Sequence, residues 1–208
     1  MVYNDVIGVR LFFSGGLVAA LSSLSVSSAT HSSSAQDPPL LKVAALREGD
    51  LLFRGGRGWR SEVVRSVSSS TLTHVGIVDL GADGQVYVIH AEPPEGSRSG
   101  KVRRQSLREF ANPGRATILV AYRPALQKAF LRQAVANAQR FSQLGVPFDD
   151  DFDLATDDAL YCSELIWKAF VLADLPFKPP QTRITFPGMT GYYLLPEDIM
   201  KMIPGRQV

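Results

Sequence analysis

The stretch YCSELIW at residues 161–167 contains the only cysteine of the chain, Cys162. Apolar residues recur here at the spacing of a helix, with Ile166, Ala169 and Phe170 on the same face as Cys162. The sequence therefore predicts an amphipathic helix that begins near the cysteine. A thiol in the first turn of a helix lies near free backbone N–H groups and the positive end of the dipole. We therefore predict a lowered pKa for the Cys162 thiol.

Upstream of this helix the sequence predicts a β-hairpin. Residues 74–80 and 85–91 are rich in β-branched residues, and an Asp-Gly turn lies between them. His74 begins the first strand, and His90 lies near the end of the second. A hairpin brings His74 close to either His90 or Glu92, because these two residues share one face of a strand. A bulge at the turn would shift the register, so both residues remain candidates.

One thiol and two imidazoles are sufficient for a cysteine nucleophile, a general base and an orienting group. We therefore predict Cys162 as the nucleophile, His74 as the base, and His90 or Glu92 as the orienting group. The backbone N–H of Cys162 is expected to help bind an oxyanion. The alternatives are a buried core cysteine with structural histidines, or a zinc ion held by Cys162, His74 and His90. No second cysteine and no helical pair of histidines supports zinc.

The remaining elements follow from hydrophobic periodicity and from glycine and proline positions. The sequence predicts strands at residues 51–54 and 117–122 and helices at 59–67, 107–111, 124–141 and 196–202. Asp158 or Ala159 is expected to precede the cap of the cysteine helix. Residues 93–115 are otherwise expected to form a basic surface loop that faces either solvent or an anionic ligand. The acidic run at 149–158 lacks the glycine and closing glutamate of a calcium loop, and a solvated loop is expected.

Composition bounds the class of protein. A length of 208 residues indicates one domain. The formal charge of +2 does not indicate nucleic acid as a partner, and a single cysteine excludes an internal disulfide framework and a cysteine-rich zinc module. Nothing in the sequence indicates the oligomeric state.

Residues 1–36 have the order of a secretory signal. Arg10 precedes an apolar run at residues 11–21, and a run rich in serine and alanine follows, with cleavage expected after Ala29 or Ala35. We therefore predict a signal peptide over residues 1–36, a hydrolase domain over residues 37–208, and a periplasmic or secreted protein. A disordered leader is the alternative.

Five stretches follow one another in the order of a known family. They are GDLLF at residues 49–53, HVGIV at 74–78, YVIHA at 87–91, and LGVPF at 144–148 before YCSEL at 161–165. In this order they resemble the YiiX-like permuted papain-like amidases, a circularly permuted branch of the NlpC-type cysteine peptidase superfamily, over roughly residues 45–200. A histidine that precedes the cysteine in the chain is the mark of the permutation.

The resemblance implies an α+β fold, in which a small antiparallel sheet packs on helices and the cysteine lies at a helix N-terminus. It implies a nucleophile at Cys162, a base at His74 and a third polar residue at His90, which it favours over Glu92. Tyr161 occupies the place where unpermuted cell-wall peptidases often have an aspartate, and it is therefore a candidate substrate contact. The implied activity is a thiol hydrolase that cleaves an amide bond without a cofactor.

The implied partner is a small peptide or acyl-conjugate substrate, at the cell wall or at a membrane surface. Residues 87–94 also resemble the lecithin retinol acyltransferase group, which suggests a lipid acyl hydrolase or acyltransferase as an alternative. The Asn-Cys-Glu-His stretch of that group is absent, because residues 161–164 read YCSE. A catalytically inactive binding module that kept the fold is the alternative from another class.

Overall fold

The computed structural model describes residues 43–68, 70–186 and 189–208. The predicted leader and the start of the predicted domain at residue 37 lie outside these residues, so both stay predictions. Among the described residues, no helix is long and apolar enough to cross a membrane.

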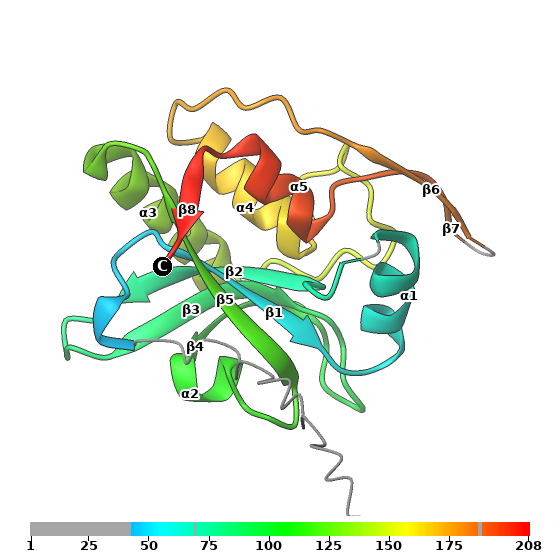
Figure 1. Ribbon diagram of the computed structural model, residues 1–208, viewed down its shortest axis with the longest axis horizontal. Helices are drawn as coiled ribbons and strands as arrows, with labels where there is room; N and C mark the ends of the chain where they lie inside the picture. Colours follow the sequence, from blue (N-terminus) through cyan, green and yellow to red (C-terminus); the bar gives the residue numbers. More distant parts are fainter. Residues whose placement is uncertain (1–42, 69, 187–188) are drawn as a thin grey trace, which may run out of the picture. The chain divides into compact units, whose positions relative to one another are not determined.

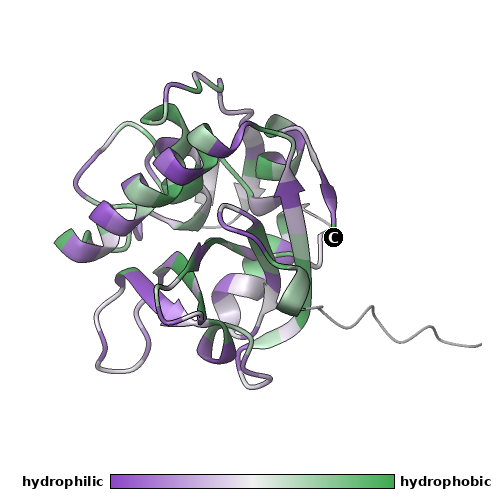
Figure 2. Ribbon diagram, turned by 90° about the vertical axis from the view of Figure 1, so that its left-hand side faces the viewer, coloured by the Kyte–Doolittle hydropathy of each residue, from purple (hydrophilic) through white to green (hydrophobic). Residues whose placement is uncertain are grey.

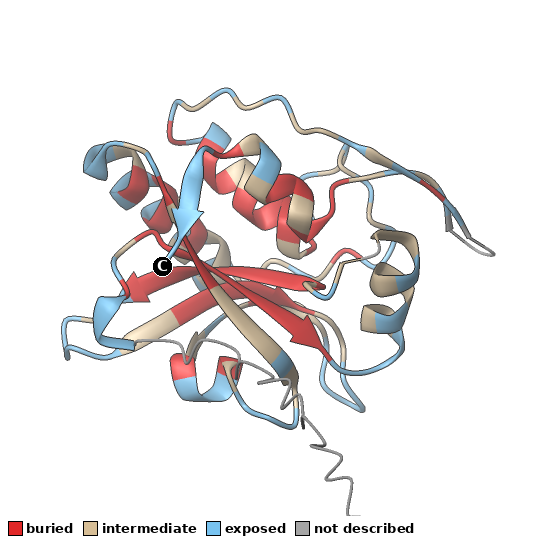
Figure 3. Ribbon diagram, viewed as in Figure 1, coloured by how far each residue is buried: buried red, intermediate tan, exposed pale blue. Residues whose placement is uncertain are grey.

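A six-stranded sheet in the order β4-β3-β2-β1-β5-β8 forms the centre of the described part, and every neighbouring pair is antiparallel (Figure 1). Its strands are β1 (Leu51–Gly56), β2 (His74–Leu80), β3 (Val86–Glu92), β4 (Lys101–Ser106), β5 (Ala116–Pro124) and β8 (Gly205–Gln207). A separate hairpin consists of β6 (Thr182–Phe186) and β7 (Met189–Tyr193). The central strands β1 and β2 are almost wholly buried (Figure 3).

Helices cover both faces of the sheet. The helical elements are η1 (Val43–Ala45), α1 (Trp59–Ser68), α2 (Leu107–Phe110), α3 (Lys128–Leu144), α4 (Cys162–Val171) and α5 (Pro196–Met202). Figure 2 shows hydrophobic and hydrophilic residues alternating along the helices, as expected for helices with one buried face.

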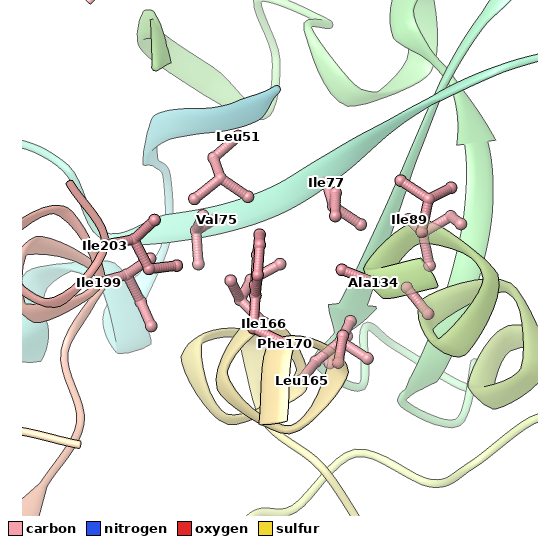
Figure 4. Packing of buried hydrophobic residues seen from close by; sticks show 14 of the residues in the cluster. Leu51, Val75, Ile77, Ile89, Ala134, Leu165, Ile166, Phe170, Ile199 and Ile203 are labelled. Carbon is pink, nitrogen blue, oxygen red and sulfur yellow. The ribbon is translucent and has the colours of Figure 1, made fainter. Parts of the chain in front are cut away.

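The larger core lies between the sheet and the helices α3, α4 and α5 (Figure 4). Val75 and Ile77 of β2 point into it and meet Ile166 and Phe170 of α4. A smaller core lies on the other face, under Phe110 of α2.

Strand alternation assigns the two histidines to the face covered by α2. Because Val75 and Ile77 face the larger core, His74 faces the opposite way, toward the ring of Phe110. His90 packs against the same ring. The register of β2 and β3 runs from Leu80↔Val86 only as far as Ile77↔Ile89, so the two strands are not paired at His74.

The structure confirms the α+β fold with an antiparallel sheet packed on helices, and it confirms that the cysteine begins a helix. The predicted hairpin, α1 and α5 match the observed elements closely. The strand predicted at residues 51–54 extends to Gly56, because a bulge at Gly55 and Gly56 carries it past the glycine-rich break.

Two expectations about the elements were wrong. The predicted loop over residues 93–115 contains β4, an edge strand whose charges hide the strand pattern, since only Val102 is buried. The predicted helix start at Pro124 is incorrect, because Pro124 ends β5 and pairs with Gly205, and α3 begins at Lys128. The cap of α4 is Tyr161, and the predicted Asp158 and Ala159 precede it by three and two residues. The strands β6, β7 and β8 were not predicted.

Gly76 makes the close approach of β2 and β3 possible. A Cβ atom at this position would lie 2.5 Å from Val88 Cγ1, 3.0 Å from the Ile89 carbonyl oxygen and 3.1 Å from His90 Cβ. Two of these neighbours are backbone or Cβ atoms, which cannot rotate away. Only glycine therefore fits beside His90.

We predict that Gly76→Ala lowers the free energy of unfolding by about 1–3 kcal/mol, because the added methyl overpacks a closed site. Urea denaturation of the two proteins measures the difference. Gly114→Ala is the control, since its Cβ would meet only the Asn112 side-chain oxygen, at 3.1 Å. A Gly76→Ala variant as stable as the control would contradict this packing.

Candidate active site

Buried contacts fix the start of α4. Tyr161 is the cap, and its backbone N–H donates to the Glu164 carboxylate at 3.2 Å. Glu164 is fully buried and pairs with Lys168 at 2.9 Å. These contacts place Cys162 as the first helical residue, where backbone N–H groups lack partners within the helix.

Tyr161 lies in the larger core. Its side chain is only 3% exposed, and its hydroxyl accepts a hydrogen bond from the backbone N–H of Leu194 at 3.2 Å. Burial raises the pKa of this hydroxyl. This environment favours a structural role for Tyr161, and its contact with substrate stays a prediction.

The Cys162 thiol is partly buried beside β2. Burial raises its pKa, while the backbone N–H of Val75, the neighbouring Ser163 and the charge of Arg54 oppose the rise. The Sγ atom lies 3.9 Å from the Ser163 hydroxyl oxygen. The expected lowering of the thiol pKa was therefore wrong, because burial outweighs the helix terminus. Contact with Val75 places the thiol beside the residue that follows His74.

His74 and His90 are joined directly. The Nε2 atom of His74 lies 2.9 Å from the Nδ1 atom of His90, and the two rings meet edge to face with centroids 5.0 Å apart. His74 is 7% exposed and His90 is fully buried. His90 Nε2 lies 3.0 Å from the side-chain oxygen of Gln105, on β4.

Glu92 does not contact His74 but lies one step further along the same chain of hydrogen bonds. Its two carboxylate oxygens each accept from Gln105 Nε2 at 3.3 Å. The carboxylate also pairs with Arg103 at 2.8 Å and with Arg115. The structure therefore brings His90 rather than Glu92 to His74, with Gln105 between His90 and Glu92.

Both histidines are held neutral at neutral pH. Burial, followed by the charge of Arg54 and the proximity of His90, lowers the pKa of His74 well below its usual value of 6.5. Burial and Arg54 also lower the pKa of His90 to about 4, although Gln105 and Glu92 act in the opposite direction. A neutral imidazole is able to accept a proton, as a general base must.

Arg54 is a buried cation that sequence reasoning missed. In the register of β1 and β2, the backbone of Arg54 lies opposite that of His74. Its guanidinium donates to the Phe110 carbonyl oxygen at 2.8 Å and lies 4.5 Å from the centre of the Phe110 ring. Its Nε atom is buried without a hydrogen-bond partner among the described residues. Burial lowers its pKa to about 10, so it remains charged at neutral pH. It lies within β1 and is one of many arginines in the sequence, so no sequence signal marks it.

The basic residues of β4 line a surface hollow of about 510 Å³. Several already have acidic partners, because Arg104 pairs with Asp79 and Arg103 pairs with Glu92. Binding of an anionic ligand by this region stays a prediction. The acidic stretch is a turn organised around buried Asp149, which accepts from the backbone N–H groups of Asp151 and Asp153.

The fold and a match to a family model define a cysteine-type hydrolase of the permuted papain-like class. The chain matches the family described as "Permuted papain-like amidase enzyme, YaeF/YiiX, C92 family" over residues 45–185, and it belongs to this family. The family consists of cysteine-type amidases and peptidases, so the chain is an enzyme of this class. No curated protein matches the chain.

A solved structure has a similar fold. The metalloprotein yiiX from Escherichia coli O157:H7 superposes with a TM-score of 0.63 and 20% identity, over 78% of this chain and 96% of that chain. Within the described ranges of this chain, no three His, Cys, Asp or Glu side chains are grouped so that they could hold a metal ion. The described residues therefore do not form the zinc site of Cys162, His74 and His90 that was one alternative from the sequence.

The raised thiol pKa predicts slow alkylation at neutral pH. We expect the rate of iodoacetamide labelling to rise with an apparent pKa above the usual value of about 8.5, because burial disfavours the thiolate. Mass spectrometry reports on Cys162 alone, since the chain has one cysteine. Labelling in urea is the control and should follow the usual value. An inflection well below 8.5 in the folded protein would show a preformed thiolate.

Proposed function

We propose that this protein hydrolyses an amide bond through a Cys162 acyl-enzyme, with His74 as the general base and His90 as the orienting residue. One observation carries the proposal. The bond between His74 Nε2 and His90 Nδ1 leaves Nδ1 as the free ring nitrogen of His74. The thiol lies beside the backbone N–H of Val75, the next residue in the chain.

In this proposal the Cys162 thiol and the His74 imidazole are both uncharged before the reaction begins. His74 Nδ1 takes the thiol proton as Sγ attacks the carbonyl carbon, so that the imidazolium forms only during the reaction. The C–N bond then breaks, and His74 returns the proton to the departing amine. Water, activated by the same nitrogen, next attacks the thioester, releases the carboxylic acid and restores the thiol.

Charge that develops on the substrate oxygen requires donors. The backbone N–H of Cys162 lies in the first turn of α4, where the helix leaves such groups unpaired and its dipole favours negative charge. We assign this N–H to the oxyanion. The buried charge of Arg54 also favours negative charge on the sulfur.

The proposed substrate is an amide in a cell-wall peptide or a similar small conjugate. Family membership supports the amide bond. Tyr161, in place of the aspartate of unpermuted cell-wall peptidases, does not offer a charge to a free peptide amine. We therefore propose a substrate whose amine is blocked or distant from the scissile bond.

A panel of peptidoglycan fragments, acyl-amino conjugates and phospholipids, followed by mass spectrometry, tests the substrate class. Release of an amine supports the amidase, and release of a fatty acid from phospholipid would replace it with a lipid acyl hydrolase. A protein that binds without turnover would support the inactive binding module.

Variants of the three residues separate their roles. Cys162→Ala should abolish turnover, because the nucleophile is lost, and Cys162→Ser should be nearly inactive, because a hydroxyl is much harder to deprotonate. His90→Ala should retain more activity than either variant, since nucleophile and base remain. Rates are measured on the best substrate of the panel. Full activity of Cys162→Ala would exclude the thiol mechanism.

We also propose that the protein acts outside the cytoplasm, after removal of a leader that ends at Ala29 or Ala35. The signal-like order of the N-terminal sequence supports this proposal. We expect N-terminal sequencing of protein from its native host to begin after Ala29 or Ala35, in a periplasmic or culture fraction. An intact Met1 in the cytosol would contradict it.

A further inference from the structure

We propose that Glu92 and Gln105 are positioning residues that determine which ring nitrogens of His90 and His74 carry protons. This inference rests on the proposed role of His74 as the base. It assigns a function to two residues that do not touch the thiol, and it explains why the chain of hydrogen bonds continues beyond His90.

The chain of hydrogen bonds begins at the Glu92 carboxylate, which can only accept hydrogen bonds. Glu92 is 2% exposed, and its carboxylate is paired with Arg103, with Arg115, and at 3.8 Å with Arg98. An ionised carboxylate offers no donor. Gln105, whose Nε2 atom lies 3.3 Å from both carboxylate oxygens, therefore turns its NH2 group toward Glu92.

This orientation determines the tautomer of His90. With its NH2 group on Glu92, Gln105 presents its carbonyl oxygen to His90 Nε2, at 3.0 Å. A carbonyl oxygen only accepts, so Nε2 of His90 carries the proton. A neutral imidazole has one N–H, and Nδ1 of His90 is therefore an acceptor.

The same logic determines the tautomer of His74. Because His90 Nδ1 accepts, His74 Nε2 donates across the 2.9 Å contact. The single proton of neutral His74 is then on Nε2, and Nδ1 keeps a free lone pair. This is the state that a base for the Cys162 thiol requires.

The opposite direction of these hydrogen bonds is disfavoured by the contact between Gln105 and Glu92. If the Gln105 amide were flipped, its NH2 group would donate to His90, and His74 would carry its proton on Nδ1. The Gln105 oxygen would then face the Glu92 carboxylate across about the same short distance, with two acceptors opposed. Glutamine alone allows both directions, so Glu92 selects between them.

The pairing of β3 and β4 places the four positions on one face. His90 on β3 lies opposite Arg103 on β4, and Val88 on β3 lies opposite Gln105 on β4. The two pairs are therefore two residues apart along each strand. Two-residue alternation then gives His90, Glu92, Arg103 and Gln105 a common face. Gln105 also borders a surface hollow of about 140 Å³, so its side chain can be changed at limited cost to packing.

Nitrogen NMR of the full chain labelled with ¹⁵N-histidine tests the proposal at pH 7, without substrate. Two-bond correlations report which ring nitrogen carries the proton, and a His31→Ala variant identifies the third histidine. We expect both His74 and His90 to be protonated on Nε2. Protonation of either residue on Nδ1 in the unmodified protein would overturn the proposal.

Variants test the direction of the hydrogen bonds that run from His74 to Glu92. In Glu92→Gln the new amide can donate to Gln105, so a His74 form protonated on Nδ1 should appear. Gln105→Leu removes the acceptor and should release His90 into both tautomers. Glu109→Gln is the matched control, because Glu109 lines the same hollow but bonds to Ser106. Unchanged tautomers in both folded test variants would exclude a positioning role.

Kinetics keep this inference separate from the proposed function. If the thiol mechanism holds, Gln105→Leu should lower kcat about tenfold or more with little change in KM, as expected for a misplaced proton. Predicted tautomers in a protein whose Cys162→Ala variant stays active would refute the mechanism and leave the proton chain intact. Wrong tautomers with an inactive Cys162→Ala variant would do the reverse.

Discussion

The hydrogen bond between His74 and His90 is the contact on which the rest of the site depends. It joins two imidazoles that are buried between the sheet and α2, where each would be unstable as a cation. The bond requires close approach of β2 and β3, which Gly76 allows. The ring of Phe110 packs against both imidazoles. A change in any of these features would move His74, the proposed base.

Burial shifts the pKa of the thiol and the pKa of the imidazole in opposite directions, and each shift favours the uncharged form of the group. The pKa of Cys162 is raised and that of His74 is lowered. In the proposed mechanism the site therefore develops charge during the reaction and does not store it beforehand. In that mechanism the helix N-terminus and Arg54 would stabilise charge that appears on sulfur and oxygen, which is the kind of interaction that lowers a barrier.

The hairpin and the cysteine helix could be predicted from the sequence, because β-branched runs around Asp-Gly and a helical apolar face are strong local signals. The pairing of His74 with His90 was one of two open choices, and the resemblance favoured the one that the structure shows. β4 was missed because an edge strand with Lys101, Arg103 and Arg104 resembles a loop.

Gln105 and Arg54 could not be identified, since their significance comes from contacts between strands rather than from neighbours in the chain. The thiol pKa was misjudged for a related reason. Position at a helix terminus is visible in the sequence, whereas the burial that opposes it arises only from tertiary packing.

The central claim is that buried, hydrogen-bonded imidazoles hold the site neutral, and a pH titration of the histidine rings by NMR tests it most directly. The folded protein should show His90 gaining a proton only near pH 4, with His74 also titrating well below 6.5. The same rings in urea should titrate near 6.5. Titration of either residue near or above 6.5 in the folded protein would contradict the account.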